Sequence, residues 1–140
     1  MLVELDPALA DRARAADVTG VEIRTADAGT TDSYRGACPA DVVLACGVFG
    51  NITDADIERT IGFCPQLCRT GGTVIWTRNR RAPDRVPLVC DWFEAQGFER
   101  VSLSLDDVHG IGVHRFIGEP QPLAEDARMF TFIGYDKLPA

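Results

Sequence analysis

Positive charge is scarce in this 140-residue sequence, which holds 14 Lys and Arg residues against 21 Asp and Glu residues, for a formal net charge of −7. Nucleic-acid binding draws most of its affinity from cationic side chains that neutralise phosphates. The composition therefore excludes a protein that coats nucleic acid, and we expect no nucleic-acid partner. An acidic balance favours solubility and says little else about partners.

Long apolar runs and paired cysteine motifs are also missing. The longest apolar run is far too short to cross a bilayer, so we expect no membrane partner. The five cysteines are an odd number and form no CxxC motif. Cys64 and Cys68 lack a second ligand pair at zinc-binding spacing, so we expect no metal site. Several cysteines lie in apolar segments, which favours reduced, buried thiols in a cytoplasmic protein. Because Met1 leads straight into a strand-like segment, we expect no signal peptide.

The apolar segments that are present alternate between strand and helix patterns, within a length that suits one domain. Strands are expected over residues 1–5, 21–25, 41–49, 73–77, 98–105 and 129–135, while residues 110–117 fit a strand or a loop. Helices are expected over residues 7–16, after the cap at residues 51–54, and from residues 83–84 to Gly97. This order predicts an α/β fold with a parallel sheet and an antiparallel tail.

Local signals support several of these boundaries. Asp6 followed by Pro7 is a favourable helix start. Pro65 is expected to break or kink the second helix, and Gly71-Gly72 to stop it. The run 41–49 (DVVLACGVF) has no polar alternation, which is typical of a parallel strand covered by helices on both faces.

Four segments carry a signal beyond fold class. They are residues 3–7 (VELDP), 26–28 (ADA), 41–49 (DVVLACGVF) and 67–77 (LCRTGGTVIWT). In this order and spacing they resemble the second to fifth strand regions of the class I, Rossmann-like, S-adenosylmethionine-dependent methyltransferases. The resemblance covers nearly all of the chain, from the family's second strand to its seventh.

The resemblance implies a role for seven residues in binding S-adenosylmethionine. By this match Glu4 binds the two ribose hydroxyls and Leu5 packs on the adenine. Asp27 accepts a hydrogen bond from the adenine amino group, beside a backbone amide at Ala28. The residues implied to face the methionine part and the adenine edge are Cys46, Gly47 and Val48. The residue types alone leave other roles open: Glu4 as an exposed strand-end charge and Asp27 as part of an ordinary turn. For Cys46 the alternative is a nucleophile, but with no His nearby in the sequence a small lining residue is favoured.

The resemblance also implies a Rossmann-like, doubly wound, mostly parallel sheet with an antiparallel C-terminal strand. The segments at Val21, Val3, Val42, Val74, Met129 and Val101 are then neighbours in that order. A gap is expected between Val3 and Val42, because the family's first strand and its glycine-rich loop would precede Met1. Residues 1–140 would form a single domain that is N-terminally incomplete.

The predicted function is methyl transfer to an unidentified small molecule, by a chain that is an enzyme if an N-terminal segment completes it. Alone, we expect it to bind the cofactor poorly and to recruit a partner chain, with a homo-oligomer as one form of this association. Two alternatives remain: a non-catalytic methyltransferase-like remnant that acts as an oligomerising or interaction module, and a fragment of a nicotinamide-dependent oxidoreductase. The antiparallel tail disfavours the second.

Candidate substrate and catalytic residues are few. The run Arg78-Asn79-Arg80-Arg81 follows a strand on the rim where open α/β sheets bind ligands. Arg78, Asn79 and Arg80 are therefore candidates to grip an anionic substrate, and a solvated basic loop is the alternative. His114 is a weak candidate for a general base, and a partnered structural histidine is the alternative.

Overall fold

The computed structural model describes residues 1–138. Its strands are β1 (Leu2–Glu4), β2 (Ile23–Thr25), β3 (Ala40–Ala45), β4 (Cys68–Asn79), β5 (Phe98–Leu105) and β6 (His109–Phe116). Its helices are α1 (Pro7–Ala15), α2 (Asp54–Leu67) and α3 (Val86–Ala95), with short 3-10 turns η1 (Thr31–Tyr34) and η2 (Tyr135–Lys137). The α/β class is confirmed.

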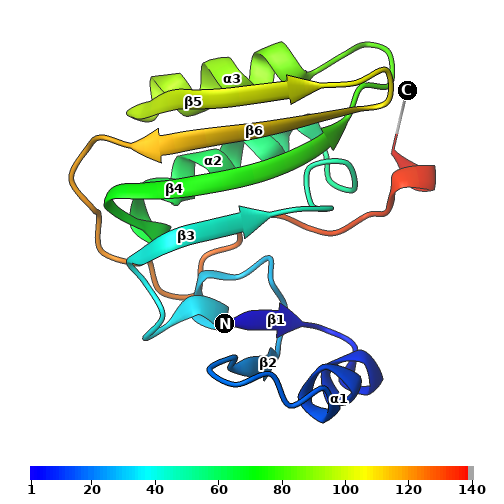
Figure 1. Ribbon diagram of the computed structural model, residues 1–140, viewed down its shortest axis with the longest axis vertical. Coiled ribbons are helices and arrows are strands. Elements are labelled where there is room, and N and C mark those ends of the chain that lie inside the picture. The colour runs from blue at the N-terminus through cyan, green and yellow to red at the C-terminus, as the bar shows by residue number, and fades with distance from the viewer. Residues whose placement is uncertain (139–140) are drawn as a thin grey trace.

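The strands form two groups (Figure 1). β1 pairs with β2 in parallel, and a separate sheet has the order β3-β4-β6-β5. β3 and β4 are parallel, whereas β6 runs antiparallel to both β4 and β5. Within residues 1–138, no strand is hydrogen-bonded between β1 and β3. The gap that was expected between the segments at Val3 and Val42 is confirmed, because these segments are β1 and β3.

The antiparallel strand beside β4 is residues 109–116, and the expectation that residues 129–135 form it was wrong. β3 and β6 occupy both edges of β4, so no edge remains for the later segment. Residues 129–135 instead run past α2 in an irregular path. Thr131 N donates to Asp56 Oδ2 at 3.0 Å, and Ile133 N donates to Asn51 O at 2.9 Å. Met129 is buried there, so an apolar, strand-like run serves as core filling.

Several expected boundaries also needed correction around α2 and β4. α2 continues through Pro65 and ends two residues later at Leu67. Gly71-Gly72 therefore lies inside β4 and does not stop the helix. Gly71 has φ +79°, which glycine adopts without the cost that a Cβ brings, and the pairing of β3 with β4 shifts register there.

The core lies between the four-stranded sheet and the pair α2 and α3, which cover the same face of the sheet (Figure 1). Val74 and Trp76 point from β4 toward these helices and are fully buried. The Trp76 ring stacks on the ring of Phe93 from α3, with 6.2 Å between the ring centroids. The Phe49 ring centroid also lies 6.2 Å from that of Trp76. Each fully buried large apolar side chain contributes about 1.5–3 kcal/mol, so this cluster supplies much of the fold's stability.

The opposite face of the sheet remains open. Val42 and Leu44 of β3 are 53% and 66% exposed, and Ile111 of β6 is 44% exposed. Parallel strands normally have both faces covered, so this apolar face is unusual. No helix among residues 1–138 is long and apolar enough to cross a membrane.

Candidate functional site

β1 and β2 run in parallel, as do β3 and β4, and both pairs point in the same direction (Figure 1). The carboxyl ends of these four strands therefore lie on the same side of the molecule. Open α/β sheets bind their ligands at this edge. Glu4 ends β1 there, and its Oε1 accepts a hydrogen bond from Asp6 N at 2.9 Å. Leu5 follows with 68% of its surface exposed. An exposed apolar side chain beside a carboxylate suits a ligand with a flat apolar ring and hydroxyl groups.

Asp27 follows β2, and its carboxylate is already engaged. Oδ1 accepts from Gly29 N at 2.8 Å, and Oδ2 pairs with Arg128 at 2.6 Å. These bonds hold the pKa of Asp27 below its usual range, although partial burial opposes the shift. An adenine amino group would therefore share this carboxylate with Arg128.

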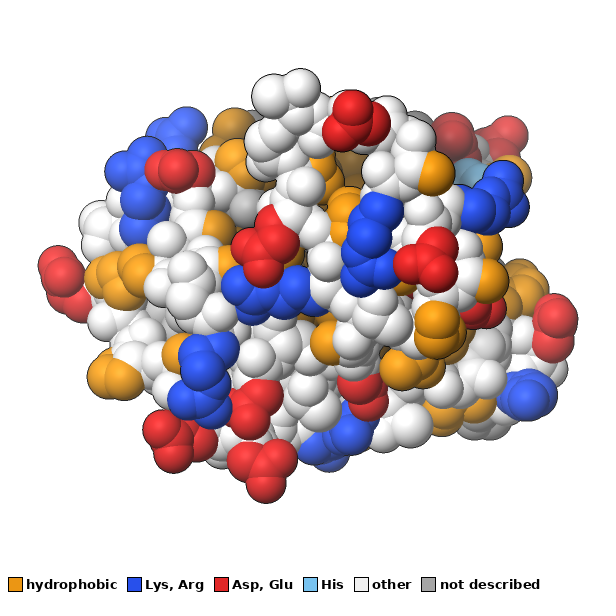
Figure 2. Space-filling model, turned by 90° about the horizontal axis from the view of Figure 1, so that it is seen from below, with side chains coloured by type: hydrophobic (Ala, Val, Ile, Leu, Met, Phe, Trp, Pro, Cys, Tyr) orange, Lys and Arg blue, Asp and Glu red, His pale blue; other side chains and the backbone are white. Residues whose placement is uncertain are grey.

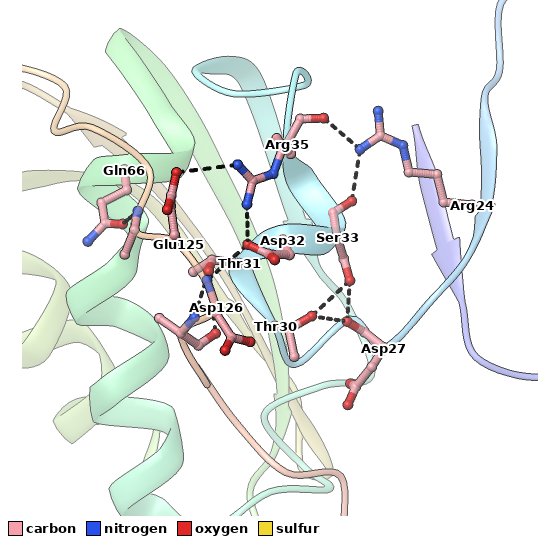
Figure 3. A network of polar contacts seen from close by, with 12 residues as sticks. Arg24, Asp27, Thr30, Thr31, Asp32, Ser33, Arg35, Gln66, Glu125 and Asp126 are labelled. Atoms are coloured by element: carbon pink, nitrogen blue, oxygen red, sulfur yellow. Dashed lines mark hydrogen bonds and ion pairs between the residues drawn. The ribbon is translucent and has the colours of Figure 1, made fainter.

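A polar network fastens the loop that carries Asp27 to a segment about a hundred residues later (Figure 3). Asp32 Oδ1 accepts from Asp126 N at 2.9 Å and pairs with Arg35 at 2.7 Å. Ser33 Oγ donates to Asp27 O at 2.5 Å. The neighbouring Tyr34 donates to Ala28 O at 2.8 Å, and burial raises the pKa of Tyr34 to about 12. The network fixes the loop conformation at Asp27 and Ala28.

The turn after β3 contains the other predicted cofactor residues. Cys46 and Gly47 are exposed and Val48 is half-buried. Gly47 has φ +72°, and its N–H donates to Thr77 Oγ1 of β4 at 3.0 Å. Because a Cβ at Gly47 would meet open space, the backbone there is accessible to a ligand. The turn therefore exposes peptide groups at the sheet edge, held in place by the next strand.

A cavity of about 270 Å³ opens beyond the carboxyl end of β4, next to this turn. Of the three candidate substrate residues, Arg78 and Asn79 line it and Arg80 does not. Arg80 instead pairs with Asp84 at 2.9 Å and donates to Asp106 O at 2.6 Å. Arg81, the last residue of the predicted basic run, also lines the cavity. The lining further includes Asp54, Arg85 and Tyr135, which sequence reasoning missed. Tyr135 was hidden in the segment mistaken for a strand.

His114 lies away from this edge, in the core. It is 0% exposed, its ring stacks on Phe93 at 4.7 Å, and its Nδ1 accepts from Trp76 Nε1 at 3.1 Å. Burial, followed by the charge of Arg100, lowers the pKa of His114 to about 4. A substrate at the sheet edge cannot reach this imidazole. The geometry favours the structural role over that of a general base.

The cysteines differ in their surroundings. Cys64, Cys68 and Cys90 are buried, and burial raises the pKa of the Cys68 thiol to about 12. Cys46 is exposed at the candidate site. Among residues 1–138, no group of three or more His, Cys, Asp and Glu side chains has a metal-binding arrangement.

The chain has a class I methyltransferase-like fold, as its superposition on solved methyltransferase structures shows. An O-methyltransferase family protein from Burkholderia thailandensis superposes on 83% of this chain with a TM-score of 0.66 and 16% identity. The N-methyltransferase NodS from Bradyrhizobium japonicum WM9 superposes on 83% with a TM-score of 0.62 and 13% identity. The 16S rRNA N2 G1207 methyltransferase RsmC of T. thermophilus, solved with AdoMet and guanosine, superposes on 88% with a TM-score of 0.53 and 16% identity.

The superposed region is only part of these proteins. It covers 43% of the Burkholderia protein, 72% of NodS and 30% of RsmC. No protein-family model and no curated protein sequence matches the chain. The likeness therefore concerns the fold, at sequence identities of 16% and below.

Proposed function

We propose that this chain is the greater part of an S-adenosylmethionine-dependent methyltransferase domain that acts on a small molecule. One observation carries the proposal. In a methyltransferase-like fold, the strand ends bring Glu4, the loop at Asp27 and the turn at Cys46–Val48 to one edge. Fold alone does not define an activity, so the argument rests on these residues.

The residues at this edge fit a nucleoside. The Glu4 carboxylate can accept two hydrogen bonds from neighbouring ribose hydroxyls. The exposed Leu5 side chain offers an apolar surface for the adenine ring. The ordered loop at Asp27 and Ala28 presents polar groups to the ring edge. Gly47, with its exposed backbone, lets the methionine part approach closely.

Bound S-adenosylmethionine supplies an electrophilic methyl group on its sulfonium sulfur. The protein's residues then have to hold the acceptor atom in line with that methyl and keep water out, since proximity and orientation account for much of the barrier. The turn at Cys46–Val48 and the wall formed by Arg78 and Asn79 are adjacent, because Gly47 N–H donates to Thr77 Oγ1, one residue before Arg78. They can hold an acceptor beside the cofactor edge.

A small-molecule acceptor agrees with the charge. The net charge is −7, and the face seen in Figure 2 mixes acidic, basic and apolar side chains without one broad basic area. An RNA acceptor like that of RsmC requires phosphate neutralisation over a larger surface. The adjacent cavity of about 270 Å³ suits a small ligand.

The test is a titration of the ¹⁵N-labelled chain with S-adenosylhomocysteine, followed by amide chemical shifts in NMR spectra. We expect weak binding, with shifts concentrated at Glu4, Leu5 and Gly47. Glu4→Gln should weaken binding about ten- to 150-fold, the equivalent of a charge-assisted hydrogen bond of about 1.5–3 kcal/mol. Glu58→Gln on the exposed side of α2 is the matched control and should change nothing.

Two results would contradict the proposal. One is unchanged affinity in Glu4→Gln. The other is a parallel NADH titration that shifts the same amides more strongly, which would favour the nicotinamide-dependent alternative.

A second candidate function, a non-catalytic interaction module, is favoured by the unpaired edges of β1 and β3 within residues 1–138. Such edges pair readily with strands of other chains. Stable oligomers combined with no shift at Glu4 in the same titration would support this candidate over methyl transfer.

A further inference from the structure

The cavity beyond β4 gathers positive charge in an acidic protein. Arg78, Arg81 and Arg85 line it, and Asp54 is the one carboxylate among the described lining residues. The formal charge of this wall is therefore +2, in a chain whose net charge is −7. A concave wall of one charge sign attracts ligands of the opposite sign.

Two of the three guanidinium groups share one counterion. Asp54 Oδ1 lies 3.2 Å from Arg78 Nη2, and Asp54 Oδ2 lies 2.8 Å from Arg85 Nε. Each carboxylate oxygen is thus occupied by one arginine. Within residues 1–138, no carboxylate lies within 4 Å of Arg81, whose guanidinium carbon instead sits 5.3 Å from the centre of the Tyr135 ring.

Arg78 is a desolvated cation with incomplete compensation. Its side chain is 12% exposed, and one Nη group donates to the backbone oxygen of Phe49. Its buried Nε has no hydrogen-bond partner among the described residues. Burial lowers the pKa of Arg78, which reflects the cost of holding its charge there. An anion in the adjacent cavity would offset that cost.

The surrounding elements favour the same kind of ligand. α2 begins at Asp54, so its N-terminal end, which carries a partial positive charge, lies at the cavity. The C-terminal segment closes the other side through Tyr135 and lies by the carboxyl ends of β3 and β4 (Figure 1). Gly50 lines the cavity, two residues after the turn at Cys46–Val48.

We propose that this cavity binds an oxyanion group, a carboxylate or a phosphate, of a small molecule, with Arg81 and Arg85 as its direct partners and Arg78 as fixed positive charge behind them. The further statement that this molecule is the methyl acceptor rests on the function proposed above. The oxyanion anchors the acceptor beyond the end of β4, beside the turn after β3, whose Gly47 N–H donates to Thr77 Oγ1 of β4.

The test uses the ¹⁵N-labelled chain without any cofactor. Sodium phosphate and sodium acetate are titrated separately at constant ionic strength, with chloride as the balancing ion. We expect saturable shifts at the amides of Asn79, Arg81 and Tyr135 with millimolar dissociation constants, and no saturation with chloride alone. Tighter binding of phosphate identifies a phosphoryl group, and tighter binding of acetate identifies a carboxylate; either preference supports the site.

Paired variants make the test specific. Arg81→Gln should weaken binding at least threefold, and this exposed side chain is expected to leave the fold intact. Arg81→Gln with Arg85→Gln should weaken it at least tenfold. The matched control removes two exposed arginines elsewhere, Arg12→Gln with Arg115→Gln, and should bind as the parent does.

Absence of saturation with both anions, or equal affinity in the arginine variants and the parent, overturns the oxyanion site. Because no cofactor is present, this outcome is independent of the methyl-transfer proposal. Oxyanion binding without any S-adenosylhomocysteine shift at Glu4 would leave the anion site standing and remove only the methyl acceptor assignment.

Discussion

The His114 side chain is fully buried, unlike that of most histidines. Its Nδ1 accepts a hydrogen bond from Trp76, so the neutral ring carries its proton on the buried Nε2, which has no hydrogen-bond partner among the described residues, and protonation of Nδ1 would break the bond to Trp76. Its pKa is lowered from 6.5 to about 4 by burial, with Arg100 adding to the shift and Glu94 opposing it. The side chain therefore links folding to pH.

We predict that stability falls as the pH drops from about 6.5 to about 4, because the unfolded chain takes up a proton that the folded chain excludes. The stability tied to His114 is fully present above pH 6.5 and amounts to about 3 kcal/mol at most. Urea unfolding at pH 7, 5.5 and 4.5 measures it. His114→Gln should flatten the profile, and His109→Gln, at an exposed histidine, should not. Equal slopes in both variants would refute the assignment.

Cys46 is the exposed thiol closest to the proposed cofactor edge, and we predict that it is not a nucleophile. In methyl transfer the acceptor atom attacks the methyl group directly, so a thiol intermediate is unnecessary. Cys46→Ala should retain measurable methyl transfer in a radiolabelled-methyl assay of the active enzyme. Complete loss of transfer with unchanged S-adenosylhomocysteine binding would assign a chemical role to the thiol.

At the scale of elements, β6 packs against β4 through an unusually close contact. A Cβ at Gly112 would lie 2.2–2.5 Å from three atoms of the Trp76 indole. Gly112 and Trp76 are directly paired across the two strands. The Trp76 indole thus occupies the space that a side chain at position 112 would fill. The close packing of this indole on β6 therefore requires glycine at position 112.

Gly112→Ala should therefore destabilise the fold by about 1–3 kcal/mol, the usual cost of overpacking a core. Gly62→Ala is the control, because Gly62 lies inside α2 and a Cβ there meets open space. That change should stabilise the fold by about 0.5–1 kcal/mol through helix propensity. Thermal unfolding of the two variants compares them, and a neutral Gly112→Ala would show that the indole can move aside.

At the scale of the whole molecule, two features of the described residues leave surface uncovered. One is the open face of the four-stranded sheet, and the other is the break between β1 and β3. Both Val42 and Leu44 expose more than half of their surface. β1 and β3 each pair with one neighbour in the described part of the chain. Contiguous apolar surface next to free backbone groups favours association.

We predict that the chain self-associates at concentrations in the tens of micromolar. Leu44→Lys should shift the equilibrium toward the monomer, because a charge on the open face opposes burial. Val108→Lys places the same charge at an exposed position in the turn between β5 and β6 and should leave association unchanged. Size-exclusion chromatography with light scattering provides the masses. A parent chain that stays monomeric at about 100 µM, which is above this concentration range, would contradict the prediction.

Local patterns in the sequence determined most of the elements. Asp6 before Pro7 started α1 as expected, and its carboxylate accepts from Ala8 N at 2.7 Å. The bounds of β5 were predicted as residues 98–105 and are the same in the structure. Such features depend on neighbours along the chain, namely caps and residue alternation, which a sequence displays directly. The break between β1 and β3 in the described residues was also predicted, from the resemblance to the methyltransferase family.

Only the tertiary structure decided which of two apolar runs became the strand beside β4. Residues 109–116 took that edge, and residues 129–135 filled the core beside α2, although both runs suit a strand. It likewise brought Arg81, Arg85 and Tyr135 around one cavity and placed His114 in the core. These outcomes depend on competition for a limited number of strand edges and on contacts between residues far apart in the chain. Local propensity and spacing contain no information on that competition.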